Sequence, residues 1–197
     1  MTKPTFLPGD IFMVDSKKTC PKVVKFFQTA PTVWQHIWRK FFGNQEKVLY
    51  YHVGMFSENN DIIEQQGKVI ERSSDKLLNT DNNLLVVRPK NITDEQRYFI
   101  LGFAREDLGE GYDILNCFGK FLTWLTGIIY FARYMELPDK DICINRVAYW
   151  YKMSEISTFG AKTHSELTTH TMWKYIIDHP EKFEIIYQGV PREGFGK

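Results

Sequence analysis

The chain contains three cysteines, and Cys143 is the best candidate for a nucleophile. It follows the sequence Pro-Asp-Lys-Asp-Ile and begins a helical pattern in which Val147, Tyr151 and Ser154 share one side. A thiol in the first turn of a helix lies beside unpaired N–H groups at the positive end of the helix dipole, which favour a thiolate. The same N–H groups could form part of an oxyanion hole.

The other two cysteines have weaker chemical contexts. Cys20 precedes Pro21 in a lysine-rich loop, and Cys117 lies in the apolar sequence ILNCFGKFL. A buried cysteine behaves as a small hydrophobic residue, so a core position is the better interpretation of Cys117. The odd number of cysteines, with no Cys-x-x-Cys pair, excludes a disulfide framework and a zinc ribbon.

His52 is the candidate general base, because it lies in the apolar and aromatic sequence YYHVGMF, where a strand provides a rigid platform. The alternative is a buried histidine that binds a backbone carbonyl. Glu64 lies in the next predicted strand, and it would accept the Nδ1–H of the imidazole if the two strands pair. Without that pairing, Glu64 is a solvated charge on an edge strand. Gln66 shares a face with Glu64 and is an alternative neighbour of His52, whereas Gln65 points the other way.

The remaining histidines have ordinary local contexts near loops or on helices. They are His36, His164, His170 and His179. No two histidines have the spacing of metal ligands with a third ligand close by, so the sequence predicts no metal site. It predicts no cofactor either.

The elements that must position these residues are a block of strands followed by a block of helices. Strands are predicted over residues 9–15, 48–56, 61–65, 68–72, 84–88 and 182–188, with a hairpin turn at Gly67. Helices are predicted over 21–42, 93–108, 116–134, 141–154 and from 168 or 169 to 178. This order predicts an α+β fold in which a small antiparallel sheet packs against helices. We expect one domain over 1–197, with a helical insertion at 21–42 and a loose tail at 190–197.

Composition excludes several classes of protein. The chain has 197 residues, 43% of them hydrophobic, and a net charge of +1, which argues against binding nucleic acid by neutralising many phosphates. The apolar run over 121–132 is too short to cross a bilayer, which needs about 20 residues. The N-terminus shows no signal peptide, so we expect a protein that is cytoplasmic as synthesised.

Six short motifs occur in a fixed order along the chain. They are PGDIF at 8–12, HVGMF at 52–56, IIE at 62–64, GYD at 111–113, the helix that carries Cys143, and the turn His179-Pro180 before FEII at 183–186. This set resembles the permuted papain-like amidases, the YiiX/YaeF-like branch of the NlpC-type superfamily, which is distantly related to lecithin:retinol acyltransferase. Because papain-like enzymes place the cysteine before the histidine, the order here implies a circularly permuted papain-like fold.

The resemblance also implies roles for individual residues. It makes Cys143 the nucleophile, His52 the general base and Glu64 the residue that orients the base. By the same resemblance, Asp10, Tyr112 and Asp113 bind substrate, shape the site or support its turns. The sequence departs from the family pattern after the cysteine, where Ile144-Asn145 replaces the usual serine and acidic residue.

Three functions follow as expectations. The first is a cysteine hydrolase that cleaves an amide in a peptide or a peptidoglycan stem peptide, reached through a phage particle, lysis or a secretion system. The second is a lipid acyltransferase or thioesterase with the same triad, in which the apolar segment 118–131 lines an acyl channel or lies against a membrane. The third is a structural or binding protein that kept the fold without catalysis. The sequence leaves the oligomeric state open.

Overall fold

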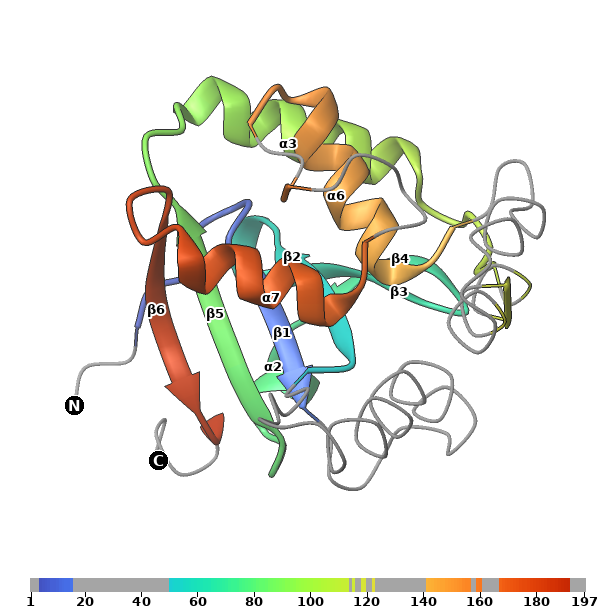
Figure 1. Cartoon of the computed structure of the whole chain (residues 1–197), viewed down its shortest axis with the longest axis horizontal. Coiled ribbons are helices and arrows are strands. Elements are labelled where there is room, and N and C mark those ends of the chain that lie inside the picture. The colour runs from blue at the N-terminus through green and yellow to red at the C-terminus, as the bar shows by residue number, and fades with distance from the viewer. Residues whose placement is uncertain are drawn as a thin grey trace, which may run out of the picture.

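Six strands form a single antiparallel sheet in the computed structural model (Figure 1), which describes residues 4–15, 50–113, 115, 118–119, 122, 141–156, 159–160 and 167–191. The strands are β1 (Ile11–Asp15), β2 (His52–Phe56), β3 (Asp61–Gln66), β4 (Lys68–Ser73), β5 (Asn83–Pro89) and β6 (Phe183–Gly189). Their order across the sheet is β4-β3-β2-β1-β5-β6, and every neighbouring pair is antiparallel.

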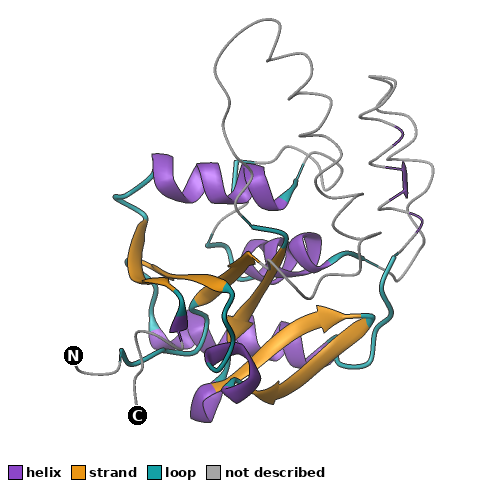
Figure 2. Cartoon of the chain, turned by 90° about the horizontal axis from the view of Figure 1, so that it is seen from below, coloured by secondary structure: helices purple, strands orange, loops and turns teal. Residues whose placement is uncertain are grey.

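The helices of the described residues cover both faces of this sheet. They are α2 (Asp75–Leu78), α3 (Asp94–Glu106), α6 (Cys143–Met153) and α7 (Thr169–Asp178), together with the 3₁₀ turn η1 (Glu58–Asn60). The longest of them, α3, begins with a capping box in which Thr93 and Gln96 exchange hydrogen bonds of 3.0 and 3.1 Å. Thr168 and Thr171 form the same arrangement at the start of α7. Figure 2 shows these elements after a quarter turn.

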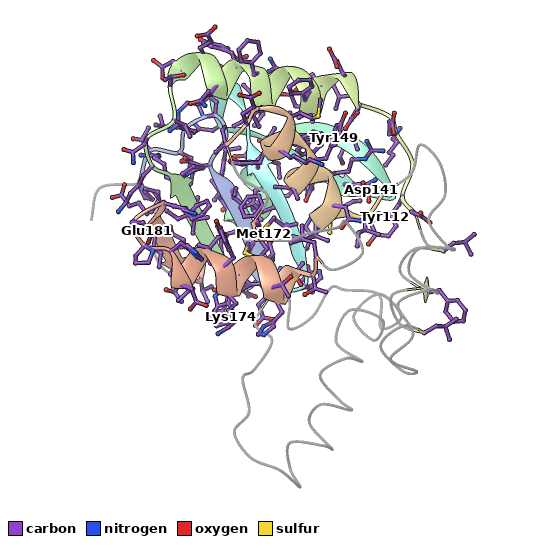
Figure 3. All side chains as sticks on the ribbon, turned by 45° about the horizontal axis from the view of Figure 1, so that its top comes forward. Tyr112, Asp141, Tyr149, Met172, Lys174 and Glu181 are labelled. Atoms are coloured by element: carbon purple, nitrogen blue, oxygen red, sulfur yellow. The ribbon has the colours of Figure 1, made fainter. Side chains whose placement is uncertain are left out.

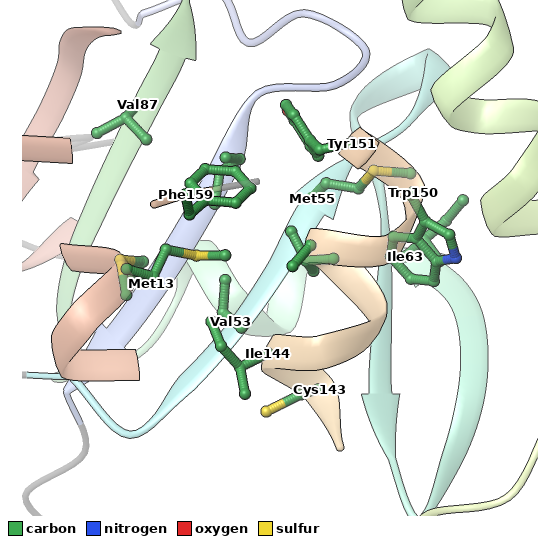
Figure 4. Close-up of a cluster of buried hydrophobic side chains, with 14 of the residues drawn as sticks. Met13, Val53, Met55, Ile63, Val87, Cys143, Ile144, Trp150, Tyr151 and Phe159 are labelled. Atoms are coloured by element: carbon green, nitrogen blue, oxygen red, sulfur yellow. The ribbon is translucent and has the colours of Figure 1, made fainter. Parts of the chain in front are cut away.

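Alternating side chains divide the sheet between two cores. On one face, Met13, Val53 and Met55 are fully buried beneath α3, α6 and α7 (Figure 4). On the other face, Phe12 and Phe56 pack with Leu77, Leu78 and neighbouring residues. The central strands are therefore buried on both sides, and α6 packs directly over β2 and β3.

Gly54 explains part of the HVGMF motif. A Cβ atom at this position would lie 2.4 Å from Cζ of Phe12 and 2.8 Å from the backbone oxygen of Ile63. Both contacts are closer than atoms tolerate, and one of them is to backbone. The strand that carries His52 therefore needs glycine two residues later, so that β1 and β3 can close around it.

The predicted α+β class, the antiparallel sheet and the hairpin at Gly67 are confirmed. The strand predicted over 48–56 begins later, at His52, and the helix predicted over 141–154 begins at Cys143. The short helix α2 was not predicted, because four residues are too few to show a helical period. Among the described residues, no helix has the length and apolar character needed to cross a membrane.

Several sequence predictions lie outside the described residues. They are the helical insertion at 21–42, almost all of the helix at 116–134, the last six residues of the tail, and the side chains of Cys20, Cys117, His36 and His164.

Candidate active site

The structure brings Cys143 and His52 together from distant parts of the sequence. Cys143 is the first residue of α6, is 2% exposed and carries a free thiol. His52 is the first residue of β2, and its ring shares a hydrogen bond with the Cys143 side chain. Figure 4 shows Cys143 at the first turn of α6, on the side of Val53, which follows His52 in the strand. A candidate nucleophile and a candidate base are therefore in direct contact.

Glu64 is the second partner of the imidazole. Nε2 of His52 lies 2.7 Å from Oε2 of Glu64, and Glu64 is 1% exposed. The pairing of Gly54 with Glu64 places the carboxylate beside the end of β2. Gln66, the alternative neighbour, instead donates its amide to the same Oε2 at 3.2 Å. The sequence prediction named Nδ1 as the nitrogen that faces Glu64, and this was wrong.

The geometry of the ring explains the difference. Nε2 is the nitrogen farther from the backbone, so it reaches across to the neighbouring strand. Hydrogen bonds of the ring to Glu64 and to the Cys143 side chain place the imidazole between the carboxylate and the thiol.

Arg72 contacts the site and was not singled out from the sequence. Its Nε lies 2.6 Å from Oε1 of Glu64, and its Nη2 lies 2.5 Å from the same oxygen. Arg72 is opposite Ile62 in the β3–β4 hairpin, and Ile62 shares a face with Glu64. Extending the predicted turn at Gly67 along both strands would have given this register, and hence this contact.

Electrostatics favour charged forms of both His52 and Glu64. Burial lowers the pKa of His52, but hydrogen bonds to Cys143 and Glu64 and the charges of those groups outweigh burial and raise the pKa from 6.5 to about 10. Burial raises the pKa of Glu64, while the hydrogen bonds and positive charges of His52 and Arg72 reverse this effect and lower it below its usual value. An imidazolium is therefore the favoured state of His52 at neutral pH.

We expect the imidazole of His52 to titrate near pH 10, well above 6.5. Replacing Glu64 with glutamine removes a negative charge that stabilises the imidazolium, so it should lower the pKa of His52. Proton NMR of the hydrogens bonded to the imidazole carbons measures both values, with the resonances assigned by their loss in His52→Gln. A titration near 6.5 that Glu64→Gln does not change would contradict this electrostatic picture.

Ion pairs of the buried Arg146 hold α6 against the end of α3. Arg146 binds Asp107 at 3.0 Å and Glu110 at 2.5 Å. The indole N–H of Trp150 also donates to Asp107 at 2.7 Å. Because these contacts come from the helix that begins with Cys143, they help to fix the position of its thiol.

Tyr112 and Asp113 support the start of the same helix. The backbone N–H of Tyr112 donates to Gly67 in the β3–β4 turn at 2.8 Å, and that of Asp113 donates to Asp141 at 2.9 Å. Tyr112 and Asp141 also form a parallel bridge, and Figure 3 labels both side chains in this region. Asp141 in turn accepts the N–H of Ile142, the residue before Cys143, at 3.0 Å. This segment therefore connects the hairpin that carries Glu64 to the helix that carries the thiol.

Asp10 lies away from these residues. Its carboxylate is fully buried and accepts two hydrogen bonds from Arg88, of 2.9 and 2.7 Å, and one from the N–H of Leu7 at 2.8 Å. Its backbone oxygen accepts the N–H of Phe56 at 2.8 Å, at the opposite end of β2 from His52. The structure thus places Asp10 in a supporting turn and not beside the thiol.

The other described histidines also lie elsewhere. His179 donates Nδ1–H to the carbonyl of Tyr175 at 2.7 Å, and His170 lies beside Trp173 on α7. In the part of the chain that the structure describes, no group of three or more histidine, cysteine, aspartate or glutamate side chains has the geometry to hold a metal ion.

No family model matches the chain, and no curated protein matches its sequence. Among solved structures, it is similar to the crystal structure of metalloprotein YiiX from Escherichia coli O157:H7. The TM-score is 0.51 and the identity is 16%, over 94% of this chain and 87% of that one. The chain has a YiiX-like fold. At this level of identity, the YiiX-like similarity describes the arrangement of the chain and not its chemistry.

Proposed function

We propose that the chain is a cysteine hydrolase with a circularly permuted papain-like fold, and that it cleaves an amide through an acyl-enzyme. The observation that carries the proposal is the series Cys143–His52–Glu64, in which one imidazole contacts both a free thiol and a buried carboxylate. This is the arrangement by which a base activates a nucleophile while a third group orients the base.

The first half of the reaction forms the acyl-enzyme. The thiolate of Cys143 attacks the amide carbonyl carbon, a C–S bond forms, and the carbonyl oxygen becomes an oxyanion. His52 then gives its proton to the leaving nitrogen as the C–N bond breaks, which releases an amine. Glu64 holds the ring and stabilises the imidazolium. The N-cap of α6, Ile142, provides no capping side chain, which leaves first-turn N–H groups as candidate donors to the oxyanion.

The second half returns the enzyme to its starting state. His52 takes a proton from water as the water oxygen attacks the thioester carbonyl. The C–S bond then breaks, a carboxylic acid leaves, and Cys143 is again a thiolate beside an imidazolium. No group outside these three residues and water is needed to balance the protons.

The departure from the family pattern after the cysteine falls on buried positions. Ile144 and Asn145 are each 1% exposed, and Ile144 belongs to the core beneath α6. A substitution there changes how the helix packs and leaves the thiol, the imidazole and the carboxylate in contact. By analogy with the family, we propose a peptide or a peptidoglycan stem peptide as the substrate.

A second candidate is hydrolysis or transfer of a lipid acyl group by the same residues. Leu115 and Phe118 are 44% and 38% exposed, and Phe118 begins the apolar segment 118–131. If these two side chains belong to a contiguous apolar surface, that surface would suit an acyl chain. The nucleophilic step is unchanged, but the leaving group becomes a thiol or an alcohol.

Trapping of an acyl adduct tests the proposal and separates the two candidates. The protein is mixed either with a panel of N-acyl peptide anilides and muropeptides or with fatty acyl thioesters, and the intact mass is measured after a rapid acid quench. We expect an adduct on Cys143 from the amide panel, its loss in Cys143→Ala, and its retention in a variant that lacks only Cys20 and Cys117. An adduct from thioesters alone supports the lipid candidate, and no adduct from either panel overturns both.

A further inference from the structure

The geometry points to Arg72 as a positioning residue that acts on the Cys143–His52 pair through Glu64. The inference rests on the proposed function and extends it by one residue. It assigns Arg72 two tasks, which are to fix the rotamer of Glu64 and to keep its carboxylate ionised. Arg72 would not touch the substrate or the reacting atoms.

The two oxygens of Glu64 are held in different ways. Among the described residues, Oε1 binds only Arg72, through Nε at 2.6 Å and Nη2 at 2.5 Å. Oε2 binds His52 at 2.7 Å and Gln66 at 3.2 Å. Two nitrogens of Arg72 hold Oε1, which restricts rotation of the carboxylate. Fixing Oε1 therefore also keeps Oε2 directed at the imidazole. A carboxylate held by His52 and Gln66 alone could turn about its last bond.

The charge of Arg72 matters because Glu64 is almost entirely buried. A carboxylate that is 1% exposed becomes neutral unless cations or donors compensate its charge. Glu64 faces His52 from β2 and Arg72 from β4, and the thiol of Cys143 on α6 reaches it through His52. Lys68 lies on the same face of β4 but is exposed and pairs opposite Gln66. Arg72 is therefore the cation in direct contact with Oε1.

The position of Arg72 makes it accessible to a clean test. Its side chain is 27% exposed, so a shorter residue there opens no closed cavity. Arg105 offers a matched control, because it also binds a β4 carboxylate, Glu71 at 3.0 Å, but Glu71 points to the opposite face of β4 from Arg72, and Arg105 makes its other ion pair with Glu58. Arg72→Gln and Arg105→Gln remove the same charge from neighbouring regions.

The experiment measures the rate of Cys143 alkylation by iodoacetamide between pH 4 and pH 9 in variants that lack Cys20 and Cys117. The acid limb of this profile is the pH range in which the rate begins to rise. We expect Arg72→Gln to move this limb to a pH about one unit higher, since removing a nearby positive charge raises the pKa of acids. At a pH below the limb, the rate falls about tenfold. Arg72→Lys should restore part of the shift because it keeps the charge, and Arg105→Gln should leave the limb in place.

A second measurement does not depend on reactivity. The ¹³C resonance of the Glu64 carboxyl, assigned by its loss in Glu64→Gln, should titrate at higher pH in Arg72→Gln than in the parent. If the carboxyl and the alkylation limb both stay unchanged in a folded Arg72→Gln protein, the inference is overturned while the proposed function stands. If the parent itself shows no alkylation that depends on His52, the proposed function fails, and the carboxyl titration still decides the role of Arg72.

Discussion

Replacing His52 with alanine should lower the rate at which iodoacetamide alkylates Cys143 at pH 7 by about 100-fold, and hydrolysis of the substrate by about 10²–10⁴-fold. The imidazolium is the positive group in direct contact with the thiol, so its loss removes the main stabilisation of a thiolate at a buried position. Hydrolysis loses more than alkylation, because the leaving amine also loses its proton donor. Stopped-flow alkylation and a steady-state assay measure the two effects.

His179→Ala is the matched control for this result. That histidine lies at the end of α7, and its ring binds a backbone carbonyl, so its removal should leave both rates unchanged. Binding a carbonyl was the alternative interpretation of His52 from the sequence. Equal alkylation rates in His52→Ala and the parent protein, with the fold intact, would show that His52 fills a structural position and would sink the proposed mechanism.

Replacing Trp150 with alanine should destabilise the fold by about 3–5 kcal/mol. Trp150 is fully buried, and its removal leaves a large cavity between α6 and the sheet and takes away one of the two hydrogen bonds to Oδ2 of Asp107, which Arg146 still binds. Trp150→Phe retains most of the ring volume and should cost about 1–3 kcal/mol, because it loses a hydrogen bond to a charged group. Urea unfolding followed by circular dichroism gives both values.

Lys152→Ala provides the comparison on the same helix. Lys152 is exposed, so the free energy of unfolding should change by no more than about 0.5 kcal/mol. A loss near 1 kcal/mol for Trp150→Ala would mean that the core beneath α6 can collapse around the missing ring. In that case α6 would not be the rigid support for Cys143 that its ion pairs indicate.

The parts of the fold that could be predicted are those with local signals. The helix starts predicted at 93 and at 168 or 169 agree with the caps Thr93 and Thr168, because a capping side chain acts within three residues. Gly67 marked the hairpin because it has a φ of +77°, a conformation that glycine adopts without strain. The proximity of Cys143, His52 and Glu64 came instead from the order of several motifs, since no local rule joins residues so far apart.

The parts that could not be predicted depend on partners far along the chain. Asp10 and Arg88 are separated by 78 residues, and nothing near Asp10 indicates which arginine will bind it. Arg146 likewise pairs with Asp107 across 39 residues. A buried charged side chain needs a partner of opposite charge, but only the packed structure identifies the residue that supplies it. The contact of Nε2 of His52 with Glu64 likewise depends on a partner twelve residues along the chain.

The tight hairpin between β3 and β4 has a consequence for how the site comes into being. Glu64 and Arg72 are eight residues apart, whereas β1 pairs with β5 across most of the first half of the chain. Contacts close in sequence form sooner than distant ones, because a short loop costs less entropy to close. We therefore expect the contact between Glu64 and Arg72 to form earlier in folding than the contact between His52 and Cys143, which requires α6 to dock on the sheet. A chain still emerging from the ribosome would then hold the carboxylate and its arginine in place before the thiol joins them, and under the proposed function only the finished molecule would react.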